Sequence, residues 1–289
     1  MRRLAKSVSA AALCLALAFV SNAAFADPQN SVDTAFETVE AAAAAVLFTP
    51  VIQIDHARLA AEEGVVMPPS RVQLFSDAAV NTSILQENVR AGLDLPFRVL
   101  AYEQDGETVV SYTSSAFLAR RHNLKEASAL SQFDTRLNEM LARTETIVPV
   151  AVPVQNIGPD FAVIELKSQY DVAVTVARLK EAVMAQSDTI WFGEIDFQGN
   201  AANEGVSLLP AQLLLFGGPA PGGVAMAQYP AIGLDAFCQK LLVYEDEDGK
   251  AIVLFNDIAA MAEHYYGTST DPQAMLNKRL TATFSTALN

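Results

Sequence analysis

Cysteine is almost absent from this chain of 289 residues, which holds only Cys14 and Cys238. Cys14 lies in an N-terminal segment that we expect to be removed, so Cys238 would remain alone and no internal disulfide could form. Free cysteine is among the most buried residue types, so we expect Cys238 to be a small buried hydrophobic residue. A reactive thiol would need a cationic neighbour, for which Lys240 is the nearby candidate.

Positive charge is also scarce. The chain has 19 Lys and Arg against 33 Asp and Glu, a formal net charge of −14. Binding to nucleic acids or anionic lipid surfaces depends on clustered Lys and Arg, and the sequence has no such cluster. We therefore expect no nucleic-acid partner.

Catalytic and metal-binding motifs are missing too. The three histidines, His56, His122 and His264, have no spacing typical of a metal site, and no Gly-x-Ser-x-Gly nucleophile motif occurs. We expect no metal and no cofactor. The weak catalytic candidates are Asp55, His56 and His122, which would have to converge within hydrogen-bond distance to act as an acid-base site. Otherwise His56 is a polar residue at a strand-to-helix junction and His122 ends a helix.

An apolar run lies near the N-terminus, and no later stretch is long and uncharged enough to be a membrane helix. Arg2, Arg3 and Lys6 precede an apolar stretch over 10–20, and Ala24-Phe25-Ala26 has the pattern of a cleavage site. The run is shorter than the roughly 20 residues that span a bilayer. We expect residues 1–26 to be a signal peptide and the mature protein to be periplasmic or secreted, with three fewer positive charges and no membrane span.

An internal duplication organises the rest of the chain. Landmarks of one half recur in the other at one constant offset: Asp55 with Asp196, Gly64 with Gly205, Phe75 with Phe216, and Gly92-Leu93-Asp94 with Gly233-Leu234-Asp235. Tyr102-Glu103 matches Tyr244-Glu245 after one extra residue. Such a register indicates two copies of one domain. We assign 27–143 to the first repeat, 144–160 to a proline-containing linker and 161–289 to the second.

Each repeat is predicted to be an α+β domain, a mainly antiparallel sheet with helices packed on one face, long enough for its own core. Asp105-Gly106 predicts a hairpin turn in the first repeat. We expect Asn81 or Thr82 to cap one helix, Asp271 to cap the last, and 222–232 to hold another. The second repeat opens with Phe161-Ala-Val-Ile-Glu-Leu-Lys167, a strand that the first lacks.

These segments resemble the family catalogued as domain of unknown function 302. The first repeat supplies Ile54-Asp55-His56-Ala57 and Gly92-Leu93-Asp94-Leu95-Pro96, and the second supplies Phe216-Gly217, Pro219 and an acidic Asp-Gly hairpin. The resemblance implies a helix-grip or TATA-binding-protein-like domain that pairs as a homodimer, so two copies in one chain would form an intramolecular pseudo-dimer. It implies no activity. The second repeat departs from the pattern, with Phe197 in place of His56.

Two features have alternative interpretations. Asp55 and Asp196 could face a pocket, but capping of the following helical turn is favoured. Gly217 and Gly218 precede a predicted helix and could hold an anion, but no Lys-Ser/Thr ending follows and Asp77 occupies the equivalent place in the first repeat. A simple turn is favoured.

The preferred hypothesis is a non-catalytic protein that binds a small apolar or amphipathic ligand, or a periplasmic protein. It rests on the 51% hydrophobic content and the absence of catalytic groups. The weak ligand-binding candidates are Phe75, Tyr112, Asp196, Phe216, Gly217, Gly218, Phe255 and Asn256. The alternatives are a hydrolase or redox enzyme using the three catalytic candidates, and a purely structural assembly.

Overall fold

The computed structural model describes residues 27–144, 147–237 and 239–289. The predicted signal peptide and Cys238 lie outside these ranges. The first repeat contains α1 (Pro28–Ala45), β1 (Thr49–Asp55), α2 (His56–Glu62), β2 (Ser70–Ser76), α3 (Ala78–Glu87), the short 3-10 helix η1 (Val89–Asp94), β3 (Phe97–Gln104), β4 (Glu107–Tyr112), α4 (Ser115–His122) and α5 (Ala127–Leu141).

After the short strand β5 (Val150–Ala151), the second repeat follows the same order. It contains β6 (Val163–Lys167), α6 (Val172–Met184), β7 (Ile190–Asp196), α7 (Phe197–Asn203), β8 (Ala211–Gly217), α8 (Pro219–Met226), the 3-10 helix η2 (Pro230–Leu234), β9 (Gln239–Glu245), β10 (Ala251–Asn256), α9 (Ile258–Tyr266) and α10 (Asp271–Leu288).

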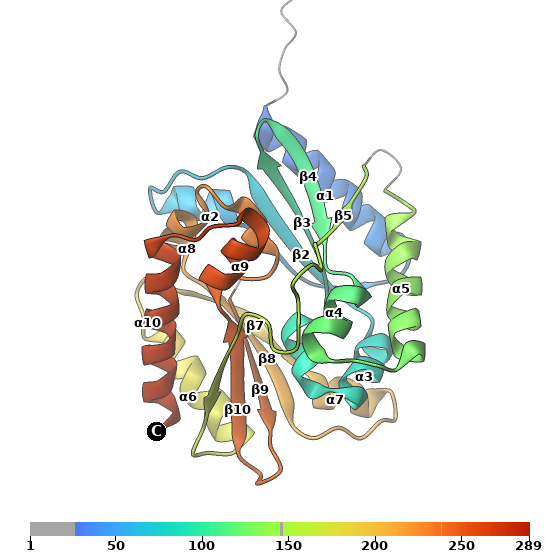
Figure 1. The fold of residues 1–289 in the computed structure, drawn as a ribbon, viewed down its shortest axis with the longest axis vertical. Helices are drawn as coiled ribbons and strands as arrows, with labels where there is room; N and C mark the ends of the chain where they lie inside the picture. Colours follow the sequence, from blue (N-terminus) through green and yellow to red (C-terminus); the bar gives the residue numbers. More distant parts are fainter. Residues whose placement is uncertain (1–26, 145–146, 238) are drawn as a thin grey trace, which may run out of the picture.

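The strands form two five-stranded sheets, in the orders β1-β2-β3-β4-β5 and β6-β10-β9-β8-β7. All neighbours are antiparallel except β4 and β5. The predicted α+β class is therefore confirmed. Figure 1 shows the first sheet in the upper part of the molecule and the second in the lower part.

Each sheet has one face covered by helices of its own repeat. Helix α1 packs on β2, β3 and β4, and α5 packs against α1 and α3. In the second repeat α6 packs on β7, β8, β9 and β10, and α10 packs against α6. Under these helices the first repeat stacks Phe97 on Phe133, with ring centroids 4.2 Å apart, and the second sets Phe216 and Phe255 edge-on to Phe284.

The two repeats pack against each other reciprocally, which gives the pseudo-dimer. Helix η1 lies on β8, β9 and β10 of the second sheet, and η2 lies on β2, β3 and β4 of the first. Helix α2 packs on α8, and its equivalent α7 packs on α3. The hydrophobic cores are consequently shared: Phe197 and Leu242 belong to the core of the first sheet, and Ala60 and Met67 to that of the second. The expectation of a separate core for each repeat is corrected.

Three predicted helix boundaries are also wrong. Asp77, rather than Asn81 or Thr82, caps α3, because its carboxylate accepts a hydrogen bond from the Val80 amide at 3.2 Å. The helix expected over 222–232 is two helices, with Pro230 beginning η2. The last helix is capped by Thr270, whose amide donates to Gln273 Oε1 at 2.8 Å.

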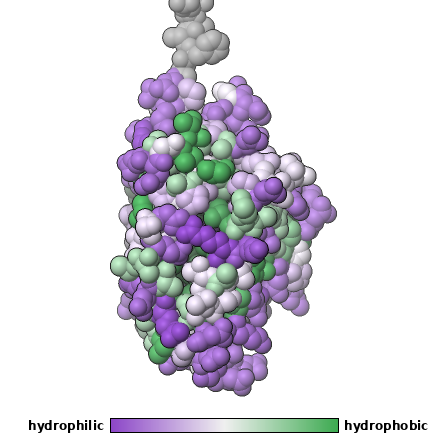
Figure 2. All heavy atoms as spheres, turned by 90° about the vertical axis from the view of Figure 1, so that its left-hand side faces the viewer, coloured by the Kyte–Doolittle hydropathy of each residue, from purple (hydrophilic) through white to green (hydrophobic). Residues whose placement is uncertain are grey.

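No helix in the described part of the chain is long and apolar enough to cross a membrane. Figure 2 shows the face of the molecule on the left of Figure 1, where α2, α8 and α10 lie. Hydrophilic residues are spread over this face, with smaller hydrophobic areas between them. Val66, which follows α2, and Val224 of α8 are among the exposed apolar residues of the chain.

Candidate functional site

The strand-to-helix junctions of the two repeats place one ring each at the interface between them. Asp55 Oδ1 accepts a hydrogen bond from the Arg58 amide at 2.9 Å, and Asp196 Oδ1 accepts one from the Gly199 amide at 2.9 Å. Both carboxylates therefore cap the following helix, as the favoured interpretation predicts. The next residue, His56 in one repeat and Phe197 in the other, begins that helix with a buried side chain.

The glycines of the two Gly-Leu-Asp segments lie against these rings. A Cβ at Gly92 would be 2.8 Å from Leu242 Cδ1 and 3.0 Å from Phe197 Cε2. Both atoms belong to the other repeat, so glycine is required for close approach rather than for an unusual φ. The Gly-Leu-Asp segment of the first repeat thus packs closely against side chains of the second repeat.

Gly233 has the equivalent neighbours. A Cβ there would be 3.2 Å from His56 Cδ2, 3.2 Å from Leu100 Cδ1 and 2.8 Å from Met226 Cε. His56 holds the place of Phe197, and Leu100 that of Leu242. The two sides of the interface therefore match position by position, and His56 in one repeat stands where Phe197 stands in the other.

The imidazole of His56 is buried, with 8% of the residue exposed. Burial lowers its pKa to about 4, because desolvation disfavours the charged ring. A hydrogen bond to the Gly233 backbone acts in the opposite direction, as expected when a ring N–H donates to a carbonyl. Nε2 has no hydrogen-bond partner, so Nδ1 makes that bond. At neutral pH the ring is therefore neutral, and its Nε2 is buried without a hydrogen-bond partner.

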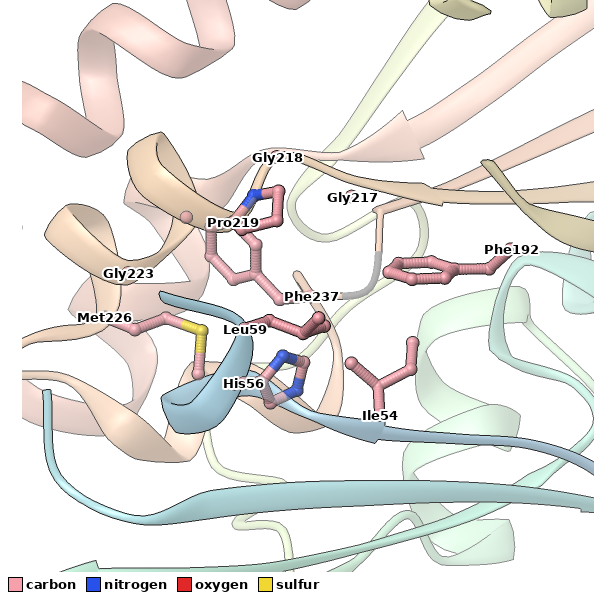
Figure 3. A pocket seen from close by; sticks show the side chains of 11 residues that line it. Ile54, His56, Leu59, Phe192, Gly217, Gly218, Pro219, Gly223, Met226 and Phe237 are labelled. Carbon is pink, nitrogen blue, oxygen red and sulfur yellow. The ribbon is translucent and has the colours of Figure 1, made fainter. Parts of the chain in front are cut away.

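His56 lies in the wall of a small cavity between the repeats. Its volume is about 30 Å³, enough for a water molecule, which needs roughly 10–15 Å³ by this measure. Ile54, His56 and Leu59 line it from the first repeat, and Phe192, Gly217, Gly218, Pro219, Gly222, Gly223, Met226 and Phe237 from the second. Figure 3 shows the His56 ring between Ile54, Leu59 and Met226, facing the Phe237 side of the cavity.

A buried network of charges occupies the centre of the interface. One atom, Nη2 of Arg98, lies 2.6 Å from Asp94 Oδ1 and 2.6 Å from Asp235 Oδ1. The two aspartates end the equivalent Gly-Leu-Asp segments, and all three side chains are at most 1% exposed. Arg98 thus joins the repeats directly.

Further groups extend the network on both sides. Arg121 Nη1 donates to both oxygens of Asp94, at 2.8 and 2.9 Å, and its Nη2 donates to Asn256 Oδ1 at 2.7 Å. Asn256 Nδ2 in turn donates to the Asp235 carbonyl at 2.6 Å. His122 Nε2 is 2.6 Å from Asp94 Oδ2. These bonds tie helix α4 of the first repeat to strand β10 of the second.

The pKa values of several groups in this network are shifted by burial and by the neighbouring charges. Burial raises the pKa of Asp94, but Arg121 and Arg98 outweigh it and hold that pKa well below the usual value. Burial lowers the pKa of His122. Burial also raises the pKa of Tyr265 well above its usual value, and the neighbouring Asp235 adds to the effect. The carboxylates of the network are buried and paired, and their hydrogen bonds join the two repeats.

The three catalytic candidates have separate partners. Asp55 pairs with Arg58 at 2.6 Å, His56 bonds the Gly233 backbone, and His122 bonds Asp94. Among the described residues, no hydrogen bond links any two of the three. A metal cluster of at least three His, Cys, Asp or Glu residues is likewise absent from the described part of the chain.

The ligand-binding candidates are divided among several places. Phe75, Phe216 and Phe255 are buried beneath the helices of their own repeats, where they pack on other rings, and Tyr112 is half-buried at the end of β4. Asp196 is a helix cap and Asn256 belongs to the charged network. Gly217 and Gly218 line the cavity. The three phenylalanines therefore belong to the packed cores between helices and sheet.

Sequence reasoning missed Arg98, Arg121, Asp94, Asp235 and Tyr265 as interface residues. One signal was present: Arg98 interrupts the otherwise apolar run Phe97–Tyr102, and a charge in the middle of a buried strand requires a partner. The identity of that partner depends on how the repeats dock.

Comparison with known proteins places the chain in a family. The model of the family described as "Domain of unknown function DUF302" matches residues 26–144 and again 164–284. Two curated relatives are named "Fluoride-specific ion channel FluC 1" from Brucella suis and "Fluoride-specific ion channel FluC 2" from Brucella melitensis. Each is 30% identical over 126 residues, which is 43% of this chain and 48% and 45% of the respective relative. The matched region is thus about half the length of these relatives.

Among solved structures, an uncharacterized conserved DUF302 protein from Bacillus stearothermophilus is 16% identical, with a TM-score of 0.39. The match covers 44% of this chain and 98% of that one. The family match extends over most of both repeats, with one complete set of strands and helices in each. The chain therefore belongs to the DUF302 family, as a tandem repeat of the DUF302 domain.

Proposed function

We propose that this tandem DUF302 protein is a non-catalytic binding protein, and that a small uncharged ligand binds in the cavity beside His56. One observation carries the proposal: a neutral, buried imidazole leaves Nε2 without a partner at a cavity built from both repeats. A buried polar atom without a hydrogen bond is costly, so a ligand that supplies the bond gains that energy on binding.

The lining defines the ligand chemistry. Nε2 of a neutral imidazole with a proton on Nδ1 is an acceptor, so the ligand must present a donor such as a hydroxyl group. Ile54, Leu59 and Phe237 offer apolar contact to the remainder of the ligand. The acidic chain disfavours anions. A cavity of about 30 Å³ takes only a small group unless Met226, a flexible side chain, moves aside.

The proposed setting is the periplasm or the extracellular space, after removal of residues 1–26. Recovery of the protein from the periplasm with Asp27 as its first residue, determined by intact mass, would support export. Recovery of the whole chain from the cytoplasm would contradict it. Fluoride conduction is not carried over from the relatives, because the match covers less than half of their length.

The duplication supplies a matched pair of variants to test the ligand site. His56→Phe installs the residue of the second repeat and removes the acceptor, whereas Phe197→His installs the acceptor on the opposite side. The probes are methanol, ethanol, 1-propanol and 1-butanol, with dimethyl ether and diethyl ether as controls that cannot donate. The measurement is the ¹⁵N chemical shift of the histidine ring nitrogens during titration.

We expect the alcohols, but not the ethers, to shift the His56 Nε2 resonance in a saturable way. His56→Phe should abolish this response, and Phe197→His should give no second one, because Phe197 does not line the cavity. Native mass spectrometry of protein purified from its own host should show a retained small molecule that His56→Phe loses. No saturable shift, together with identical spectra of retained molecules for wild type and His56→Phe, would overturn the proposal.

A further inference from the structure

The two repeats differ at one end of their sheets. Strands β4 and β10 are equivalent, since each follows a hairpin and pairs with the strand before it, β3 or β9. β10 has a full antiparallel partner on its other side, where β6 pairs from Val163 with Asn256 to Lys167 with Ile252. β4 has only β5 there, in parallel, at Ser111 and Tyr112. Among the described residues, therefore, no strand pairs with the first half of β4 in the place that β6 fills in the second repeat.

A groove lies at this place. It has a volume of about 800 Å³ and is lined by α1, by residues 106–110 at the start of β4, and by the segment before β5. Val109 and Val110 lie on the strand side, and Val148 and Val150 on the opposite side are 88% and 54% exposed. Helix α1 and β4 are neighbours in the upper part of Figure 1. An unpaired strand edge that faces exposed valines across a groove is a template for strand addition.

We propose that the outer edge of β4, over residues 107–110, docks an extended segment of a partner protein as an antiparallel strand. The structure contains its own template for the occupant, because β6 is such a segment, five residues long. Ile164 and Leu166 of β6 pack on the second core while Glu165 and Lys167 alternate with them. Main-chain hydrogen bonds supply affinity in this mode, and alternate side chains supply selectivity.

The charged side chains that line the groove indicate which kind of partner segment would bind there. Glu103 and Glu107 are the charged side chains that line it, and no Lys or Arg is among its described lining residues. A segment with alternating apolar residues and at least one basic residue beside Glu107 is complementary. A second copy of this chain would bring the same carboxylates to the same edge, and the like charges would repel.

The test uses the full chain, with and without residues 1–26, and two peptides. The probe peptide is FAVIKLKS, the sequence of residues 161–168 with lysine in place of Glu165. The control peptide has the same side chains but N-methyl groups on alternate backbone nitrogens, which removes the hydrogen bonds. Hydrogen–deuterium exchange of residues 107–112 is measured at several protein concentrations, and fluorescence anisotropy gives the affinity.

We expect the probe peptide to slow exchange at residues 107–110 and the N-methylated peptide to have no effect. Glu107→Lys should weaken binding about fivefold, the upper range for one exposed ion pair. The control Glu62→Lys, an exposed acidic residue on α2, should leave the affinity unchanged.

Three results would overturn the proposal. The first is exchange that the probe peptide does not change at up to millimolar concentration. The second is protection that rises with protein concentration in the absence of peptide, which would identify a second copy as the occupant. The third is protection from exchange that is found in the chain with residues 1–26 and lost in the chain without them, which would identify the chain's own N-terminal segment as the occupant. None of these depends on a ligand beside His56.

Discussion

His122 and Tyr265 hold the same place in the two repeats, each with its ring on the aspartate of its own Gly-Leu-Asp segment. His122 Nε2 is 2.6 Å from Asp94 Oδ2, and the Tyr265 hydroxyl donates to Asp235 Oδ2 at 2.5 Å. His122 on α4 and Tyr265 on α9 lie at the same position counted from the cap of the helix that follows the hairpin. The duplication has kept a polar ring at this position and changed its chemistry, while Arg98 joins the two aspartates.

Replacing Asp94 by Asn should destabilise the protein by about 3–5 kcal/mol, because Arg98 and Arg121 would keep their charges in a buried site without a full counter-charge. Urea denaturation should show a lower midpoint. The matched control is Glu194→Gln, which breaks the exposed Lys180–Glu194 pair at 3.4 Å and should cost less than about 1 kcal/mol. Equal effects of the two substitutions would contradict a stabilising network at the interface.

The stability of the protein should fall as the pH decreases from 6.5 to 4, in part because of His56. Its pKa is about 4 in the folded protein and near 6.5 when exposed, so the unfolded chain binds more protons between these values. A difference of that size corresponds to about 3 kcal/mol by the bottom of the window. His56→Phe should remove this part of the pH dependence while leaving that of His122. Parallel stability curves for the two proteins would show that His56 is not buried as a neutral ring.

Gly92→Ala should destabilise the protein by about 1–3 kcal/mol, since the new methyl group would meet Leu242 and Phe197 of the other repeat. Gly233→Ala should cost less, because its nearest neighbour is the flexible end of Met226. Gly158→Ala is the control, with no atom within 4 Å of the new Cβ, and should change stability by less than about 0.5 kcal/mol. Thermal denaturation of the three variants shows which substitution lowers the stability most. A larger loss of stability for Gly233→Ala than for Gly92→Ala would be inconsistent with the packing.

The repeats should not fold independently. Residues 27–143 alone would expose the sheet face that carries Arg98, and residues 161–289 alone would expose the face that carries Leu242. We expect each half to lack a cooperative thermal transition, and the two halves to associate when co-expressed. Near-ultraviolet circular dichroism and calorimetry provide the readout. Cooperative unfolding of either isolated half would show that the shared cores are not essential to it.

Local sequence signals predicted the strand that opens the second repeat, two helix starts and a hairpin turn. Asp55 and Asp196 predicted helix starts, and Asp105-Gly106 predicted a hairpin turn, where both residues have positive φ in the structure. These features depend on the backbone of a few neighbouring residues, so they can be inferred without the rest of the chain. The single helix predicted over 222–232 is instead α8 and η2, because Pro230 has no amide hydrogen to continue the first helix and begins the second.

The amino-acid sequence by itself determined the duplication, the α+β class and the family resemblance, since each is written in the order and spacing of residues along the chain. Only the tertiary structure decided that Gly92 and Gly233 are contact points between repeats, that Arg98 bridges two aspartates, and that His56 faces a cavity while Phe197 fills the equivalent place. Contacts between residues far apart in the chain depend on how two surfaces dock. That docking is set by shape and charge summed over both repeats, which no local pattern contains.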